Sequence, residues 1–126
     1  MNFVTYITVP LSTTRATAVV TRVQLMRGII TAISLRQMSG TANKTQVLIQ
    51  HDGGQVFPGV PESFQMPGSS AQMFPDFIKL DQVNPTVDVV AWNTDSAATG
   101  IEVVFTVINS EDFNQANGNT PVLPGT

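Results

Sequence analysis

The sequence contains no cysteine and very little charge. Of its 126 residues 12% are charged, against about 25% in an average globular protein, and the formal net charge is −3. Without cysteine there is no disulfide framework, no thiolate metal site and no thiol nucleophile. A chain of this length has room for one domain with one modest core, which packing alone must hold together.

Helix-forming residues are also scarce. There are 6 Leu, 3 Glu and 2 Lys, whereas Val, Ile and Thr together account for 39 residues. β-Branched side chains are stiff at the first torsion angle and pack well on a pleated sheet. The composition therefore predicts an all-β protein.

Basic residues are few and scattered. Arginines stand at positions 15, 22, 27 and 36, without the cluster that tracks a phosphate backbone, which argues against direct binding to nucleic acid. The first ten residues alternate between polar and apolar, unlike a signal peptide. No segment approaches the roughly 18 apolar residues that a membrane-spanning helix needs. We expect neither a secretion signal nor a membrane partner.

Apolar and polar residues alternate with period two in several segments, which predicts strands with one buried face. In segment 29–37 the pattern points Ile29, Ile33 and Leu35 inward and Ile30 outward. Asp52-Gly53-Gly54 supplies the positive-φ residues of a hairpin turn. The predicted strands are 3–9, 17–26, 29–37, 45–51, 55–57, 77–80, 87–92 and 101–107. Seven or eight such strands without a convincing helix predict an antiparallel β-sandwich, either a jelly roll or a similar Greek-key arrangement.

Two segments do not follow this pattern. Residues 58–76 form a long loop with several Pro and Gly that is nonetheless apolar, although exposed loops are normally polar. We expect it either to fold back over the core or to be buried against another chain. Residues 109–126 are polar and rich in Asn, too polar for a core of their own. The prediction is a sandwich domain over 1–108 and an extended C-terminal arm over 109–126.

No motif in the chain identifies a reaction. His51 is the single histidine, and no Gly-x-Ser-x-Gly elbow or phosphate-binding glycine loop accompanies it. The spacing of Asp76, Asp81, Asp88 and Asp95 fits neither a helical ligand pair nor an EF-hand loop. We expect no catalytic residue, no cofactor and no metal ligand, and a calcium site built from distant loops stays open.

The distribution of apolar residues favours assembly instead. Val20, Ile30, Val90 and Val104 fall opposite the expected inward positions, so parts of the strands are apolar on both faces. Interfaces are depleted in charge, as this chain is. The expected assembly contacts are Phe57, Phe64, Met66, Met73 and Phe74 in the loop and Phe113, Val122 and Leu123 in the arm.

Four stretches carry a resemblance to a known class of proteins. These are Ile7-Thr8-Val9-Pro10, Val23–Ile30 around Arg27-Gly28, Gln55-Val56-Phe57-Pro58 and Ala91-Trp92-Asn93-Thr94-Asp95. Over Thr5–Val107 the chain resembles the small all-β virion proteins of tailed bacteriophages, including capsid decoration (cement) proteins and related head components. The resemblance implies a sandwich subunit present in many copies without an active site.

Two hypotheses follow. The first is a non-enzymatic virion subunit, a decoration protein or minor head subunit assembled in the host cytoplasm. It would form a homo-oligomer, such as a trimer, and bind other virion proteins such as a major capsid protein. The alternative is a carbohydrate- or receptor-binding β-sandwich module whose ligand face is formed by Trp92, Asn93 and Asp95.

Overall fold

The structure is a computed structural model that describes residues 1–39, 44–60, 62–68 and 70–109. Eight strands and one short 3-10 helix make up its regular elements. In chain order they are β1 (Asn2–Val9), η1 (Arg15–Thr17), β2 (Val19–Gln24), β3 (Gly28–Ser39), β4 (Thr45–His51), β5 (Gly54–Phe57), β6 (Gln72–Leu80), β7 (Thr86–Asn93) and β8 (Thr99–Ile108).

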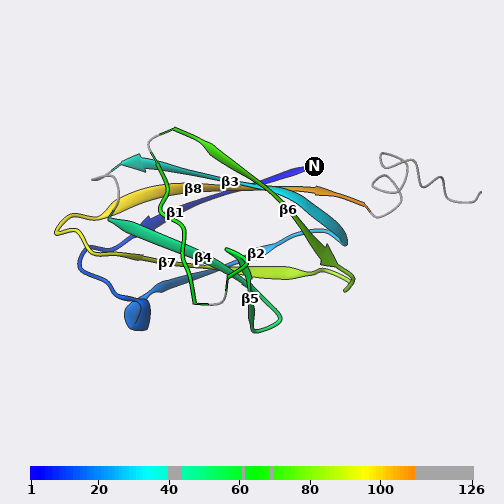
Figure 1. Ribbon diagram of the computed structural model, residues 1–126, viewed down its shortest axis with the longest axis horizontal. Helices are drawn as coiled ribbons and strands as arrows, with labels where there is room; N and C mark the ends of the chain where they lie inside the picture. The colour runs from blue at the N-terminus through cyan, green and yellow to red at the C-terminus, as the bar shows by residue number, and fades with distance from the viewer. Residues whose placement is uncertain (40–43, 61, 69, 110–126) are drawn as a thin grey trace, which may run out of the picture.

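The strands form two four-stranded antiparallel sheets packed face to face (Figure 1). The order in sheet A is β1-β8-β3-β6, and the order in sheet B is β2-β7-β4-β5. The pairs are nested: β1 with β8, β2 with β7, β3 with β6 and β4 with β5. This confirms the predicted all-β sandwich.

The core lies between the sheets and is built from the inward positions of both. The period-two pattern is visible in the burial of β8, where each odd position from Thr99 to Val107 is buried and each even position is half-buried. The largest fully buried side chains are Phe105, Ile30, Ile33, Leu35, Ile49, Leu80 and Ile101.

The predicted inward face of β3 is wrong at its beginning. Ile30 is fully buried, whereas Ile29 lies on the outer face beside Ile108. An irregularity between Ile30 and Ala32 shifts the register, so the residues before it alternate in the opposite phase to those after it. Strict alternation, extended from Ile33 toward the start of the strand, therefore places Ile29 in the core instead of Ile30.

Gly28 allows this strand to begin close to β8. Its φ is +157°, and a Cβ at this position would collide with the carbonyl oxygen of Ile108. Only glycine permits so close an approach of two backbones. A glycine is therefore required at this position by the backbone at the end of β8.

Two further elements differ from the prediction. β6 spans nine residues, where the pattern predicts only 77–80, and it contains Pro75. An edge strand tolerates proline because the outer side of its backbone forms no hydrogen bonds with a neighbouring strand. The short helix η1 is also additional; Thr14 and Thr17 stabilise it through a capping box.

The hairpin turn at Asp52-Gly53 is present, with positive φ at both residues. Within the described ranges no helix is long and apolar enough to cross a membrane. The predicted arm lies outside the described residues from position 110 onward, so the boundary at 108/109 stays a prediction.

Candidate functional site

The connection from β5 to β6 crosses the open edge of the sandwich from sheet B to sheet A (Figure 1). Gln65 exchanges two backbone hydrogen bonds with Val47 of β4, at 2.8 and 2.9 Å. Further on, the carbonyl oxygen of Gly68 accepts a 2.8 Å bond from the amide of Gln37 in β3. The connection therefore fastens one sheet to the other.

The first part of this connection is held by one side chain. The Nε2 of Gln55 lies 2.9 to 3.1 Å from three backbone carbonyl oxygens, those of Pro58, Val60 and Ser63. A single half-buried amide thus organises the turn that follows β5.

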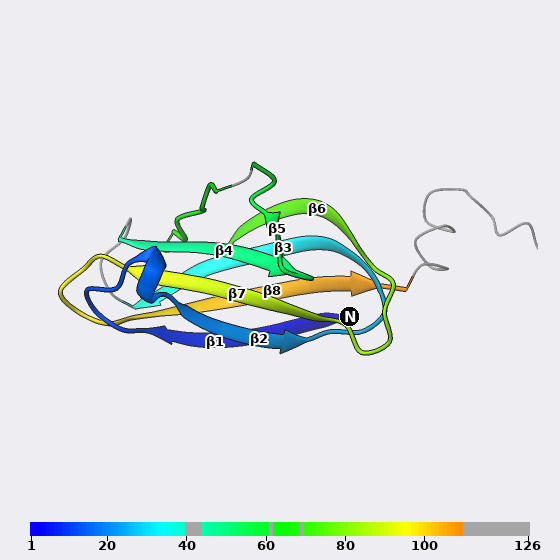
Figure 2. The same cartoon turned by 90° about the horizontal axis from the view of Figure 1, so that it is seen from below.

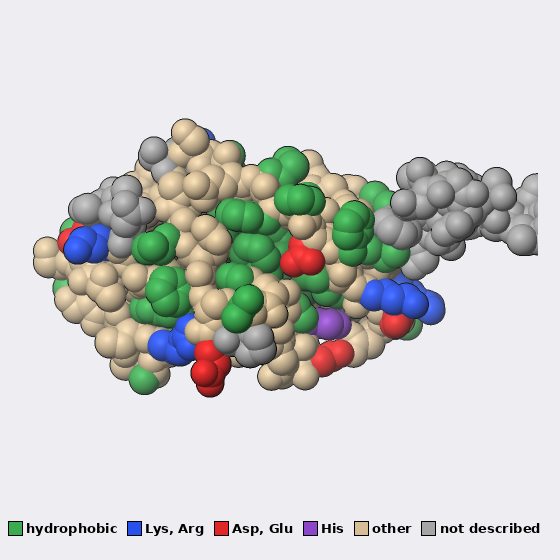
Figure 3. Space-filling model, viewed as in Figure 1, with side chains coloured by type: hydrophobic (Ala, Val, Ile, Leu, Met, Phe, Trp, Pro, Cys, Tyr) green, Lys and Arg blue, Asp and Glu red, His purple; other side chains and the backbone are tan. Residues whose placement is uncertain are grey.

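The predicted loop contacts separate into two groups. Phe57 is buried in the core, and Phe74 packs against the same core. Phe64, Met66 and Met73 remain exposed. Figure 3 views this edge of the molecule and shows hydrophobic side chains gathered over its middle. The arm residues Phe113, Val122 and Leu123 lie outside the described residues.

The outer face of sheet B is covered in part by its own chain. Leu48, Val90 and Trp92 point away from the main core, yet all are buried in a small second cluster that includes Ala18. The guanidinium of Arg15 lies 4.9 Å from the centroid of the Trp92 ring, and the Phe64 ring meets the same indole edge-on at 5.8 Å. Figure 2 looks onto this sheet, with η1 in front of it.

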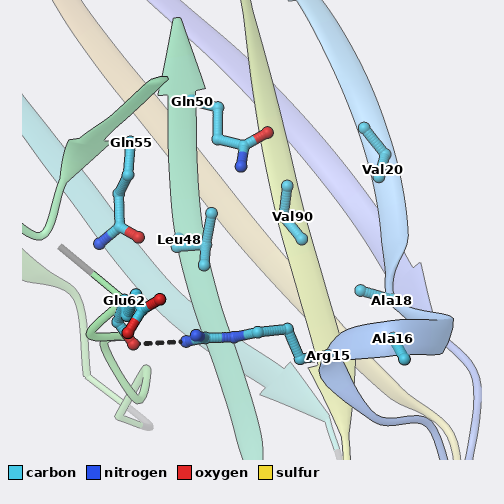
Figure 4. A pocket seen from close by; sticks show the side chains of 9 residues that line it. All are labelled: Arg15, Ala16, Ala18, Val20, Leu48, Gln50, Gln55, Glu62 and Val90. Atoms are coloured by element: carbon cyan, nitrogen blue, oxygen red, sulfur yellow. Dashed lines mark hydrogen bonds between the residues drawn. The ribbon is translucent and has the colours of Figure 1, made fainter. Parts of the chain in front are cut away.

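Beside this cluster lies a hollow of about 380 Å³. Its apolar lining comes from β2, β4 and β7 of sheet B and from Ala16 and Ala18 in and just after η1. Arg15 reaches across one end to donate a 2.8 Å hydrogen bond to the carbonyl oxygen of Glu62 (Figure 4). The lining residues are Arg15, Ala16, Ala18, Val20, Leu48, Gln50, Gln55, Glu62 and Val90. The volume lies within the range of small-ligand sites.

The outer face of sheet A differs because no described segment covers it. One row across its middle joins Val4, Val104, Ser34 and Met73 by strand register. The ends of this row are exposed, and so are the larger neighbours Tyr6 and Phe77. We call this surface the bare face; its outward residues are Asn2, Val4, Tyr6, Thr8, Ile29, Ala32, Ser34, Arg36, Met38, Met73, Pro75, Phe77, Lys79, Gly100, Glu102, Val104, Thr106 and Ile108.

Charges on the bare face are paired. Arg36 donates from Nη2 to Glu102 Oε2 at 3.3 Å, and Lys79 lies 3.9 Å from Asp81. Arg22 and Asp88 form a similar ion pair on sheet B at 3.1 Å. The hydrogen bond and the charge of Asp88 raise the pKa of Arg22.

The predicted ligand face is mostly inaccessible. Trp92 is only 6% exposed, and Asn93 is fully buried. Asn93 donates to the carbonyl oxygen of Ala97 and accepts from the amide of Asp95, at 2.8 and 3.0 Å, so it holds the loop together from inside. Asp95 is half-buried in that loop. The nearby hollow could not be predicted from the sequence, because Leu48 and Val90 fit the pattern of ordinary strand residues.

The ring of His51 contacts neighbouring residues through both of its nitrogens. Its Nδ1 lies 3.0 Å from the carbonyl oxygen of Thr86, and its Nε2 lies 3.4 Å from Asp52 Oδ2. In the described part of the chain no three His, Asp or Glu side chains gather as metal ligands would.

No protein-family model matches the chain, and no curated protein matches it. The resemblance to phage virion proteins therefore stays a prediction.

Proposed function

We propose that this chain is a non-enzymatic structural subunit of a virus particle, associated with the capsid as a decoration protein or minor head subunit. It assembles through apolar contacts with copies of itself and with other virion proteins, such as a major capsid protein. The observation that carries this proposal is the bare face. Tyr6, Met73 and Phe77 each keep 65% to 69% of their surface exposed there. A surface of this kind is typical of proteins that bury it against a partner.

The fold supports the same proposal. The nested strand pairs favour a jelly roll among the Greek-key arrangements. Jelly rolls are found in viral capsid domains and in lectins, so this support is an analogy of fold. The scarcity of charge points to contacts that tolerate salt, because screening weakens only electrostatic attraction.

Particle fractionation tests the proposal. Lysate from cells that produce the chain is treated with nuclease and separated on a density gradient, and the chain is detected with an antibody. We expect it in fractions whose nucleic acid is protected, in many copies per particle. A chain found only in the soluble fractions would overturn the proposal.

The hollow on sheet B favours a second candidate, a carbohydrate- or receptor-binding module. Its ligand would contact the lining rather than the covered ring of Trp92. Binding to a glycan array, lost in Gln50→Ala and kept in Gln24→Ala, would support this candidate. Gln50 lines the hollow, whereas Gln24 is an exposed residue at the end of β2. Equal binding by both variants, or none by the unaltered chain, counts against it.

A further inference from the structure

We propose that the occupant of the bare face is a second copy of this chain, packed sheet against sheet across a two-fold axis. The inference deepens the proposed function, on which it rests, by naming the first partner of the subunit. It rests on the contrast between the two outer faces, on the pairing of charge, on the blocked edge of β6 and on the size of the face.

The contrast between the two outer faces shows what the chain leaves for a partner. On sheet B, Arg15 of η1 and Phe64 of the connection after β5 lie over the ring of Trp92. Leu48 and Val90 are buried in the same small cluster, against which Ala18 packs. On sheet A the outward positions of the central strands, Ser34 and Val104, are only half-buried. The outward edge positions are exposed on both sheets, with Val4 and Met73 at 49% and 69% on sheet A and Val20 at 59% on sheet B. Among the described residues, the chain therefore covers the central strands of only one of its two outer faces.

The charges on the bare face suit a second copy. Arg36 and Glu102 neutralise each other, and Lys79 lies beside Asp81. A strongly charged partner finds no complementary patch here, whereas an isologous contact requires only a surface compatible with itself. Because positive and negative side chains on the face lie beside each other, two copies meet with little electrostatic repulsion, even though each chain carries a net charge of −3.

The edge of sheet A argues for packing by faces rather than by strand addition. Pro75 lies in the middle of edge strand β6 and lacks an amide hydrogen. Two residues on, the amide of Phe77 donates to Asp76 Oδ1 at 2.9 Å. Proline and local charge are common means of preventing an edge strand from pairing with another chain. A partner therefore binds more easily on the face of sheet A than at the edge of β6.

The size of the face is sufficient for a specific dimer. Four strands about 4.8 Å apart, each contributing about eight residues at about 3.3 Å, give on the order of 500 Å² in plane. Counted over both partners this is on the order of 1,000 Å², the total area at which a specific interface begins. Facing sheets lie about 10 Å apart, so Ser34 and Val104 at the centre would meet their counterparts in the copy.

Charge variants on the two outer faces test the inference. Val4→Lys combined with Met73→Lys places two ammonium groups on the bare face, and Val20→Lys places one on the outer face of sheet B. Val4 and Val20 are both valines on edge strands, 49% and 59% exposed, so neither change disturbs the core. Circular dichroism verifies that each variant is folded. The mass is measured by light scattering and sedimentation over a range of concentration, at low and high salt.

We expect the unaltered chain to be a dimer, or an even-numbered oligomer of dimers, at both salt concentrations. The Val4→Lys and Met73→Lys variant should dissociate, with a dissociation constant raised at least about 100-fold, because each ammonium loses water without gaining a partner. Val20→Lys should keep the wild-type mass.

Three results would overturn the inference, and each differs from a failure of the proposed function. If the chain is monomeric at every concentration, or if its dimer survives the bare-face changes, the second copy does not bind there. If a variant ending at Asn109 dimerises while the full chain does not, residues 110–126 compete for the face. None of these results moves the chain out of the particle fractions, which decide whether it is a virion subunit.

Discussion

The rings of Phe57 and Phe74 meet with centroids 5.2 Å apart and planes inclined by 55°. Phe57 ends β5 of sheet B, and Phe74 lies in β6 of sheet A, so this contact closes the core at the edge that the connection crosses. Both residues are apolar members of a region expected to bind another chain. Their rings serve the subunit's own core instead.

Replacing the buried ring at this contact should destabilise the subunit strongly. Phe57→Ala is expected to lower the free energy of unfolding by about 3–5 kcal/mol, because it removes apolar contacts and leaves a cavity. Urea denaturation at a concentration where the chain is monomeric measures the change. Phe77→Ala is the matched control, since that ring is 65% exposed and should cost little. Equal losses in the two variants would show that Phe57 is not a core residue.

Changing Gln55 to glutamate should release the turn after β5. The change replaces an amide that donates to carbonyl oxygens with a carboxylate that repels them, and the loss of a typical intramolecular hydrogen bond costs about 0.5–1.5 kcal/mol. Hydrogen exchange should become faster at the amide of Val47, whose partner Gln65 follows this turn. Gln50→Glu on the adjacent strand introduces the same charge and should leave that amide protected. Unchanged exchange in Gln55→Glu would contradict the role of this amide.

Removing Arg15 should uncover the single tryptophan. Arg15→Ala deletes the guanidinium over the Trp92 ring, an interaction worth about 0.5–1 kcal/mol at an exposed site. Acrylamide quenching of the fluorescence should increase and the emission should shift to longer wavelength. Arg22→Ala, whose arginine pairs with Asp88 instead, should leave both unchanged. A ring that is readily quenched in the unaltered chain would refute the burial of Trp92 and restore it as a ligand surface.

Unblocking the edge of β6 should promote aggregation. Pro75→Val combined with Asp76→Ala restores an amide hydrogen and removes the carboxylate that accepts from Phe77. We expect severalfold faster loss of soluble protein at 37 °C, followed by light scattering. Asp81→Ala removes the same charge just after the strand and should leave the rate unchanged. If both variants aggregate alike, net charge rather than the blocked edge protects the chain.

The strands and most of their inward faces could be predicted because alternation is local. A strand turns successive side chains to opposite sides, so the spacing of Ile101, Val103 and Phe105 marks the buried face of β8 without knowledge of its partners. The turn at Asp52-Gly53 is equally local. The exchange of Ile29 and Ile30 escaped this reasoning, because the irregularity that causes it arises from pairing with β6 and β8.

The candidate surfaces depend on contacts between distant residues. The sequence marked the apolar character of residues 58–76, but it gave no means to separate Phe57, which is buried, from Met73, which is exposed. It left Trp92 between a packed ring and, in the alternative hypothesis, a ligand surface; Arg15 and Phe64 cover it from 77 and 28 residues away along the chain. Burial of a side chain depends on what packs over it.

The sequence by itself determined that this is an all-β protein with no thiol chemistry and little charge, because composition and period-two patterning act residue by residue. Only the tertiary structure decided which strands are neighbours and which aromatic rings enter the core. It also decided which outer face the chain covers. All three properties depend on contacts between residues that are far apart in the sequence. The bare face of sheet A is the clearest case: its alternating residues read as an ordinary strand pattern, and its exposure emerges only when the sandwich has formed.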